Sequence, residues 1–374
     1  MNPYDFARID WTKPPRRKTP TWHHRLVGNA DQQLYSGSME VDVYAETPLF
    51  IADPRNEPAN AREPARSMQN EHGEYIIPGS SLKGMLRSVV ETLGNGCFTL
   101  FDGEYERHQV RYRDRVARDF QHCGNNTNLC ITCRTFGMLK DREGGVFLGK
   151  VNIGDAVAYT DKVYHYDPMY TAVLVDPKPH HQDFYLDEQK RYVAGRKFYF
   201  HHSQQAKPLS ANRLIDMGGR PANRYIEPLD YDTQFHFRLN FTNLEADEFG
   251  ALMLAVALEE QMRHKIGYGK PLGLGSVYLQ PMSLKLVDYS SRYTDWKSAQ
   301  DKKPLEGDSM WQVLYKHIDD FSEKHLQTLA MEDLRRIWRW PPEPGTNYYY
   351  PDKREWFDTE ASRGKRIRDT RNVP

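Results

Sequence analysis

Residues 76–94 read Ile76-Ile-Pro-Gly-Ser-Ser-Leu-Lys-Gly-Met-Leu-Arg-Ser-Val-Val-Glu-Thr-Leu-Gly94, which predicts a strand end, a turn and then a helix. Ser80 or Ser81 is expected to cap this helix, and Gly94 and Gly96 are expected to end it. Its apolar side chains recur at steps of three and one, as on one face of an amphipathic helix: Leu82, Met85, Leu86, Val89, Val90 and Leu93.

Strand patterns lie on both sides of this helix. Residues 39–45 and 235–241 alternate between apolar and polar side chains, and residues 146–153 and 276–287 also predict strands. One apolar stripe predicts a second helix: Phe249, Leu252, Met253, Val256 and Ala257. This order is typical of an α+β fold, an RRM-like or ferredoxin-like sandwich with two helices on one face of its sheet. RNA-binding domains of this shape use the free face.

The remaining segments are interpreted as additions to a core domain at 36–290. Residues 1–35 form a polar, basic N-terminal extension, and residues 97–145 form an insertion that holds all four cysteines. A second insertion, rich in Tyr, His, Pro and basic residues, is expected at about 156–233. Residues 291–374 form a C-terminal extension with one amphipathic helix, marked by Trp311, Leu314, Tyr315 and Ile318.

The composition excludes several classes of protein. The 374 residues include 51 Lys and Arg against 51 Asp and Glu, which excludes a polyelectrolyte-like coat for DNA but not a local basic groove. The mean hydropathy of -0.78 and the lack of an apolar run near the ~20 residues that a bilayer needs predict no membrane span. The first residues do not have the pattern of a secretory signal. With only four cysteines, a cytoplasmic, reducing location is expected.

The cysteines predict a structural zinc site. Cys130 and Cys133 have the two-residue spacing that lets both thiolates reach one tetrahedral ion, and Cys123 lies seven residues earlier. Either Cys97 or His108 could be the fourth ligand. A metal would hold together a segment that has few apolar side chains of its own. The alternative is four unrelated reduced cysteines.

Two further stretches predict contacts with phosphates or bases. The glycines of residues 267–275, flanked by Lys265, permit close backbone approach to a phosphate, although a tight helix-to-strand turn would need them equally. Residues 196–202, Arg-Lys-Phe-Tyr-Phe-His-His, interleave cations with aromatic rings that can stack on bases, as an ordinary strand with exposed charges also would. Lys83 and Arg87 share one face of the predicted helix near its N-terminus, where they could meet backbone phosphates.

Together these motifs resemble a known family. Residues 77–87 closely resemble the signature of the RAMP superfamily, the backbone subunits of CRISPR–Cas effector complexes. Residues Cys130 to Gly137 resemble the family's zinc-site ending, and Gly267 to Ser276 resemble its glycine-rich loop. Asp176-Pro-Lys-Pro, and Gly195 to Tyr199 with His201 and His202, are similar to the type III branch. The match spans about residues 38–290, with the motifs in the family's order.

The resemblance implies an RRM-like fold with a zinc-bearing insertion and a thumb-like insertion. It also implies binding of crRNA and target RNA beside other subunits of a type III effector complex, in antiviral defence. The residues that we expect to contact RNA are Ser80, Ser81, Lys83, Arg87, Arg134, Arg196, Lys197, Lys265, Gly267, Gly269, Lys270, Gly273 and Gly275.

Catalysis is the part of the resemblance that this sequence does not reproduce. Many type III backbone subunits cleave target RNA with an Asp upstream of the Pro-Gly-Ser-Ser motif, yet residues 62–72 contain none. Asp53 is the first candidate to orient a ribose 2′-OH or take its proton, although it could be a turn residue, and Glu63, Glu71 and His72 are other possible acid–base groups. The first hypothesis is therefore an RNA-binding scaffold. The alternatives are a target-cleaving endoribonuclease of the same complex and a stand-alone guide-processing RNase.

Overall fold

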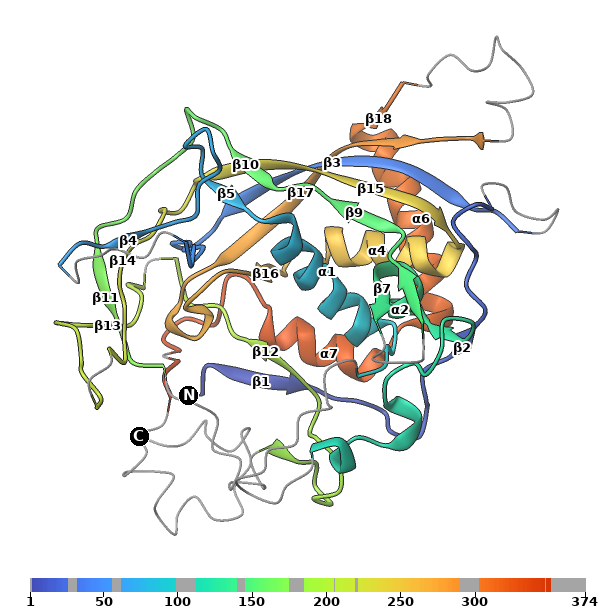
Figure 1. Cartoon of the computed structure of the whole chain (residues 1–374), viewed down its shortest axis with the longest axis horizontal. Helices are drawn as coiled ribbons and strands as arrows, with labels where there is room; N and C mark the ends of the chain where they lie inside the picture. The colour runs from blue at the N-terminus through green and yellow to red at the C-terminus, as the bar shows by residue number, and fades with distance from the viewer. Residues whose placement is uncertain are drawn as a thin grey trace.

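The computed structural model describes residues 2–25, 32–55, 62–98, 112–139, 145–174, 185–204, 206–218, 221–289, 303–346 and 348–350 (Figure 1). The helices are α1 (Gly79–Leu93), α2 (Ile131–Phe136), α4 (Ala246–Ala257), α6 (Gly307–His325) and α7 (Thr328–Ile337). The strands are β1 (Tyr4–Ala7), β2 (Arg17–Lys18), β3 (Tyr35–Ala45), β4 (Ala65–Arg66), β5 (Ile76–Ile77), β6 (Leu129–Cys130), β7 (Gly137–Leu139), β8 (Val146–Leu148), β9 (Val151–Ile153), β10 (Ala156–Ala158), β11 (Met169–Thr171), β12 (Arg196–Tyr199), β13 (Ser210–Ala211), β14 (Tyr225–Glu227), β15 (Gln234–Leu244), β16 (His264–Lys265), β17 (Ser276–Leu286) and β18 (Leu305–Glu306). Within these ranges, none of the helices is both long and apolar enough to cross a bilayer.

The main sheet has the strand order of a ferredoxin-like sandwich. Its path runs β16-β17-β3-β15-β10-β5, with β9 also beside β15 and β18 beside β17. In chain order the core elements are β3, α1, the interrupted strand β9/β10, β15, α4 and β17, a βαββαβ sequence. The fourth, first, third and second strands of this sequence therefore lie side by side, each antiparallel to its neighbour. The predicted α+β class is confirmed.

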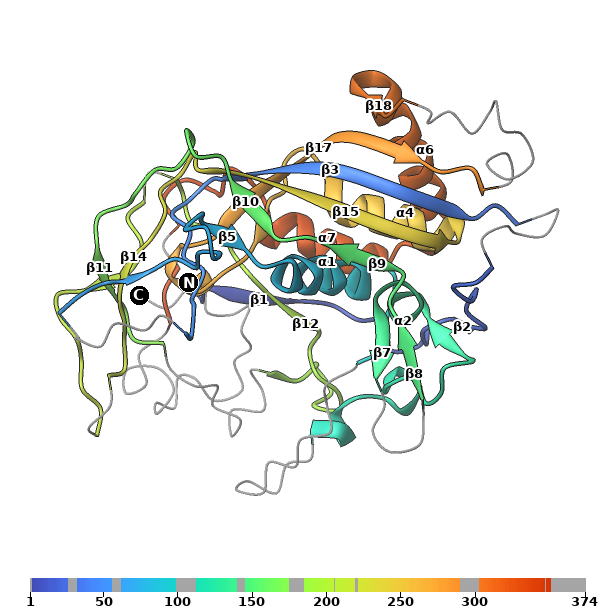
Figure 2. The same ribbon diagram turned by 45° about the horizontal axis from the view of Figure 1, so that its top comes forward.

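One face of the sheet packs on helices. Figure 2 shows the sheet as one layer, with α1, α4 and α7 below it. The alternation in β15 has the expected effect, since Phe237 and Phe241 are 1% and 2% exposed while Arg238 between them is exposed. The Phe241 ring lies 5.3 Å from that of Phe249 on α4, and Leu86 of α1 is fully buried. Burial of these apolar side chains between the layers drives the packing.

The start of α1 is fixed by a residue from another strand connection. The Gly79 N–H donates a hydrogen bond of 2.7 Å to Oδ1 of Asp155, between β9 and β10. A Cβ on Gly79 would lie 2.2 Å from the carbonyl oxygen of Ile153, so only glycine permits this approach. The prediction that Ser80 or Ser81 caps the helix is wrong. Both serines lie inside the first turn, exposed, and neither makes a side-chain capping bond.

Most other predicted elements are present with shifted ends. The strand expected at 39–45 begins earlier, at Tyr35, and α1 ends at Leu93 with Gly94 as its C-cap residue, as predicted. The strand expected at 146–153 is two strands, because β8 pairs with β7 and only β9 joins the main sheet. Helix α7 follows α6 and was not predicted.

The segment expected as a second insertion begins with part of the core. Ala156–Ala158 pairs with β5 and β15 in the main sheet, so the excursion from the core starts after residue 158. Beyond it, β11, β13 and β14 form a separate four-stranded sheet with β4. Periodicity could not reveal β10, because a three-residue strand is too short to show a pattern.

The described parts of both extensions pack against the core. Strand β1 pairs antiparallel with β12 and contacts α7, forming a further layer below the helices in Figure 2. Arg8 donates from Nε to Asp333 of α7 at 2.7 Å, and Arg336 of α7 donates to Asp5 at 2.6 Å. Strand β2 pairs with β6, next to the cysteines. The N-terminal arm (residues 2–25) therefore contacts α7, β12 and the insertion at 97–145 that holds the cysteines, which we call the cysteine segment.

We predict that Asp155→Ala lowers the free energy of unfolding by about 0.5–2 kcal/mol, because it removes the carboxylate that accepts the first N–H of α1. Chemical denaturation of the full chain measures the change. Ser80→Ala and Ser81→Ala are matched controls in the same helical turn and should each change stability by less than about 0.5 kcal/mol. A serine variant as destabilised as the Asp155 variant would contradict this assignment of the cap.

Candidate nucleic-acid interface and metal centre

The four cysteines meet at one point, as predicted. The Sγ atoms of Cys97, Cys123, Cys130 and Cys133 all lie within 4.8 Å of one another, and all four residues are buried. The Cys97 Sγ is 3.6 Å from that of Cys133 and 3.7 Å from that of Cys123. Zn–S bonds of about 2.3 Å in a tetrahedron place sulfur atoms about 3.8 Å apart, whereas a disulfide needs about 2.05 Å. The spacing therefore fits four thiolates around one metal ion and not a pair of disulfides.

Backbone hydrogen bonds within the cluster orient the sulfur atoms toward one another. Cys130 precedes the short helix α2, its N–H donates to the Cys123 Sγ at 3.3 Å, and the Cys97 N–H donates to the Cys130 Sγ at 3.5 Å. Burial alone would lower the pKa of Arg17, but a hydrogen bond to Cys123 and the thiolate charges raise it. A zinc ion with four thiolates carries two negative charges, so a cation beside it fits the site. His108, the alternative fourth ligand, lies outside the described residues.

Five of the residues predicted to contact RNA line one cavity of about 510 Å³, which we call the lysine cavity: Ser81, Lys197, Lys265, Gly267 and Lys270. Its walls come from α1, from β12 and from the glycine loop (residues 266–275), which connects β16 to β17. On the α1 side, Ser81, Gly84 and Ser88 share one helical face and are exposed. A Cβ on Gly84 would meet no atom within 4 Å, so a ligand can approach this part of α1 closely.

The three lysines of the lysine cavity have no acidic partner among the described residues. Lys265 donates to the Ser276 hydroxyl at 2.9 Å, Lys270 donates to the Gly267 carbonyl at 2.9 Å, and the Lys197 Nζ lies 3.8 Å from the centre of the Tyr4 ring. Burial and the charge of Lys270 lower the pKa of Lys265 to about 7 and that of Lys197 to about 8. Ammonium groups clustered without counter-charges favour an anionic ligand.

Lys270 lies in the glycine loop, and Lys265 comes directly before it. Gly267 and Gly275 have φ angles of 83° and 76°, a region that side chains disfavour. A Cβ on Gly275 would lie 1.9 Å from the Ile266 carbonyl oxygen, and one on Gly267 would lie 2.7 Å from that of Phe50. Gly269 and Gly273, also predicted as RNA contacts, flank a 3₁₀ turn at Lys270–Leu272. The loop therefore needs its glycines for a tight turn, and the same loop forms part of the wall of the lysine cavity.

Sequence reasoning missed several residues around the lysine cavity. Ser276 joins Lys265 to the fully buried His201, whose Nδ1 lies 2.8 Å from the same hydroxyl. Burial lowers the pKa of His201 well below its ordinary value, so the ring is neutral beside the lysine. Trp338 lines the cavity from the end of α7, and its buried Nε1 has no acceptor in the described part of the chain. The paired histidines at 201–202 were a sequence signal for this region, but Trp338 had none.

The other residues predicted to contact RNA lie elsewhere. Arg87 faces the cysteine segment and donates to the Gly137 carbonyl at 3.2 Å. Lys83 lies beside Gly149, shortly after that segment in the chain. Ser80 is exposed but does not line the lysine cavity.

Two predicted arginines are held inside the protein. Arg134 is 2% exposed and donates to Asp247 at 2.7 Å. Arg196 pairs with Glu91 and lies 4.0 Å from the centre of the Phe98 ring. We therefore leave both arginines out of the interface proposed below.

Asp53 is held by its own turn. Its Oδ1 accepts hydrogen bonds from the Arg55 backbone N–H at 3.0 Å and from the Arg55 Nε at 3.1 Å, and its Oδ2 accepts one from the guanidinium at 3.3 Å. Those hydrogen bonds lower the pKa of Asp53, which weakens it as a base. The residue is 4% exposed. This geometry matches the turn role, and cleavage through Asp53 stays a hypothesis.

The sheet face opposite the helices is polar and carries charges of both signs, since Arg238 and Lys285 share it with Glu40 and Asp42. Glu40 and Asp42 lie on either side of His236, at 2.9 and 2.7 Å from its two ring nitrogens. Arg238 pairs with Glu40, and the Tyr159 hydroxyl donates to Asp42 at 3.0 Å. This is the face that the fold class predicts to bind RNA, but the cations predicted to contact RNA do not gather on it.

Comparison with protein-family models finds a match to the RAMP superfamily over residues 42–278, more than half of the chain. No curated protein matches the chain. The matched segment runs from the end of β3 to the start of β17 and contains both core helices, the cysteines and the glycine loop. The N-terminal arm and the helices α6 and α7 lie outside it.

We predict that the purified protein carries one zinc ion per chain and that Cys130→Ser lowers both the zinc content and the midpoint of thermal unfolding. The serine hydroxyl cannot replace a thiolate ligand in a buried site. Elemental analysis and thermal unfolding, with and without a chelator, measure these changes. Thr132→Ser alters the same turn without removing a ligand and should retain the metal. Native protein with well under one zinc and four freely reactive thiols would contradict the prediction.

Proposed function

Because the chain belongs to the RAMP superfamily, we propose that it is an RNA-binding subunit of a type III CRISPR effector complex. In this proposal it holds crRNA and target RNA beside other subunits, in the cytoplasm. Membership of this family is consistent, in general, with a CRISPR-associated RNA-binding subunit. The observation that carries the proposal is the lysine cavity, where Lys197, Lys265 and Lys270 converge without acidic partners in the described residues.

The chemistry of the lysine cavity suits an RNA backbone. Lysine ammonium groups bind phosphates as point charges, without requiring a particular base. Ser81, Gly84 and Ser88 leave room for a sugar–phosphate chain to lie close to α1. Tyr268, which is half-buried, adds aromatic surface on which a base could stack. These features support recognition of a strand by its backbone, as a guide-binding subunit requires.

We propose that the four cysteines bind a structural zinc ion. The ion would fix the connection between α1, which ends just before Cys97, and α2, which begins just after Cys130. Lys83 and Arg87 face this segment, so a fixed segment would set the position of a second group of cations. The zinc-bearing insertion and the thumb-like insertion remain part of this proposal.

The alternatives of target cleavage and guide processing need a group that takes or gives a proton. The candidate Asp53 is committed to Arg55 through both oxygens, and its lowered pKa disfavours proton uptake. We therefore propose the scaffold function and do not assign an activity.

We predict that Lys197→Ala with Lys270→Ala weakens RNA binding and reduces the slope of log Kd against log salt by about 1.4. Each lost phosphate contact removes about 0.7 from the slope for a single strand. Fluorescence anisotropy over a range of KCl concentrations measures the slope. The RNA is the one that copurifies with the complex, whose sequencing shows whether it is a crRNA.

The control for this experiment is Lys316→Ala, an exposed lysine of α6 that does not line the lysine cavity. It should leave both the affinity and the slope unchanged. An unchanged slope in the double variant would show that these lysines do not contact phosphates. Copurified RNA without guide sequences would contradict the crRNA assignment.

We also predict that binding of RNA with hydroxyl ends weakens as the pH rises from 7 to 9. Lys265 and Lys197, with pKa values of about 7 and 8, lose their protons in this range, while a phosphodiester does not titrate. Bound phosphate raises both pKa values, so affinity is greatest below them and is lost above them. Lys265→Met should flatten the plot of RNA affinity against pH near pH 7, where Lys265 titrates. The affinities are measured at constant ionic strength. A flat profile in the parent protein would contradict the role of these lysines.

A further inference from the structure

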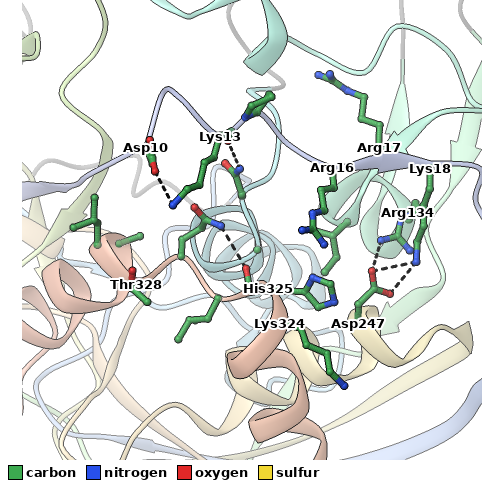
Figure 3. A pocket seen from close by; sticks show the side chains of 18 of the residues that line it. Asp10, Lys13, Arg16, Arg17, Lys18, Arg134, Asp247, Lys324, His325 and Thr328 are labelled. Carbon is green, nitrogen blue, oxygen red and sulfur yellow. Dashed lines mark hydrogen bonds and ion pairs between the residues drawn. The ribbon is translucent and has the colours of Figure 1, made fainter.

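A second cavity, of about 670 Å³, lies at the other end of α1 (Figure 3). We call it the terminal cavity, because residues 8–18 of the N-terminal arm and residues 324–330 at the α6–α7 junction form most of its wall. Both segments lie outside the family match, whereas the end of α1, α2 and the start of α4 complete the wall from within it. The match therefore says nothing about the role of this cavity.

The terminal cavity has more positive than negative charge. Seven of its lining side chains are Lys or Arg and only two are Asp. Some of the cations are neutralised, such as Lys13 by Asp10 at 3.1 Å and Lys18 by Asp247 at 3.2 Å. Arg16 has no carboxylate partner in the described ranges. Lys324 has only a 3.9 Å contact with Asp320, and both of those side chains are at least half exposed.

The charges converge on His325. In Figure 3 the Arg16 side chain extends toward His325, while Lys18 and Arg134 approach Asp247 beside it. Burial lowers the pKa of His325, and the charges of Arg16, Lys18 and Arg134 lower it further against the opposing effect of Asp247. Three cations and one carboxylate therefore act on this ring.

Two sets of hydrogen-bond donors in the wall lack acceptors. Arg134 is 2% exposed and pairs with Asp247 and Glu248 through its two terminal nitrogens, yet its Nε has no hydrogen-bond acceptor within the described residues. Helix α7 begins at the cavity, where Thr328, Leu329 and Ala330 line it. No side chain in the described chain caps this helix, and its first turn has no acidic residue. The free N–H groups and the positive end of the helix dipole suit a phosphate oxygen.

The dimensions and the other lining groups define the class of ligand. The volume is within the range of small-molecule pockets, about 300–1,000 Å³. Pro14, Ile131 and Leu329 supply apolar surface for a ribose or a base. A terminal phosphate carries about −1.5 to −2 charges near neutral pH, against one for an internal phosphodiester, so it gains more from unneutralised cations.

We propose that the terminal cavity binds the terminal phosphate of a nucleotide, either at the end of an RNA strand or on a free nucleotide. The RNA source rests on the proposed RNA-binding function, whereas the free nucleotide does not. Arg16 and Lys324 would pair with the phosphate, and the first turn of α7 would donate N–H groups to its oxygens.

The test uses the full chain and one RNA oligonucleotide in three forms, with a 5′-phosphate, with a 3′-phosphate, or with hydroxyl groups at both ends. ATP is the free-nucleotide probe, titrated by calorimetry. We expect one phosphorylated RNA, or ATP, to bind at least about tenfold more tightly to the parent protein than to Arg16→Ala with Lys324→Ala. The hydroxyl RNA should bind both proteins equally. Arg16→Lys with Lys324→Arg keeps the charges and should retain most of the effect.

Lys316→Ala, two turns before Lys324 on α6, is the matched control and should behave as the parent. Both substituted residues are exposed, so equal thermal unfolding midpoints would show that the fold is intact. A preference for phosphorylated RNA that the double variant loses assigns the cavity to an RNA end. ATP binding that the variant loses, without such a preference, assigns it to a free nucleotide. If neither probe distinguishes the parent from the double variant, the proposal is wrong.

Failure of the proposed function gives a different result. A protein that binds none of the three RNAs would contradict RNA binding through the lysine cavity, and the ATP titration would still decide whether the terminal cavity binds phosphate. Normal binding of the hydroxyl RNA, with no response to a terminal phosphate or to ATP, would instead overturn only the inference about the terminal cavity.

Discussion

The arrangement of this protein depends on a group of buried charges at the start of α4. Glu248 is fully buried and lies 2.8 Å from the Lys150 ammonium and 3.1 Å from the Arg134 guanidinium. Asp247 adds a 2.7 Å contact with Arg134 and a 3.2 Å contact with Lys18. Removing one member of such a group typically costs about 3–5 kcal/mol, because another charge is then left buried without a partner. The four segments that carry these residues must therefore dock together.

This requirement connects the sites to the core. Arg134 follows Cys133 directly, Lys150 precedes β9, and Lys18 belongs to the N-terminal arm. The cysteine cluster, the second core strand and the arm are thus all positioned relative to α4. The terminal cavity lies where these segments meet, and Asp247 is part of both its wall and the buried group. The buried ion pairs thus fix the part of the cavity wall that Arg134, Asp247 and Lys18 form.

The sequence predicted what depends on local pattern and missed what depends on distant contacts. The spacing of Leu82 to Leu93 and the alternation in β15 defined α1 and a core strand, and the spacing of the cysteines indicated their cluster. The cap of α1 was misassigned because Asp155 lies 76 residues from Gly79 in the chain. The pairing of β1 with β12 and the place of Trp338 in the lysine cavity likewise join remote segments. Residue type alone also could not separate Arg134, which is buried against carboxylates, from Lys265, which has no acidic partner in the described residues.

Charge compensation separates the cations that form ion pairs within the protein from those on which the binding proposals rest. Zero net charge over the chain means that every cation without an acidic partner is balanced by acidity elsewhere. Some of that acidity lies on the open face of the sheet, where Glu40 and Asp42 lie on either side of His236. The carboxylates of that face are paired with His236 and Arg238, whereas the three lysines of the lysine cavity have no acidic partner in the described residues. In the proposed function the RNA backbone therefore lies between α1 and the glycine loop, and not on the free face that RRM-like domains commonly use.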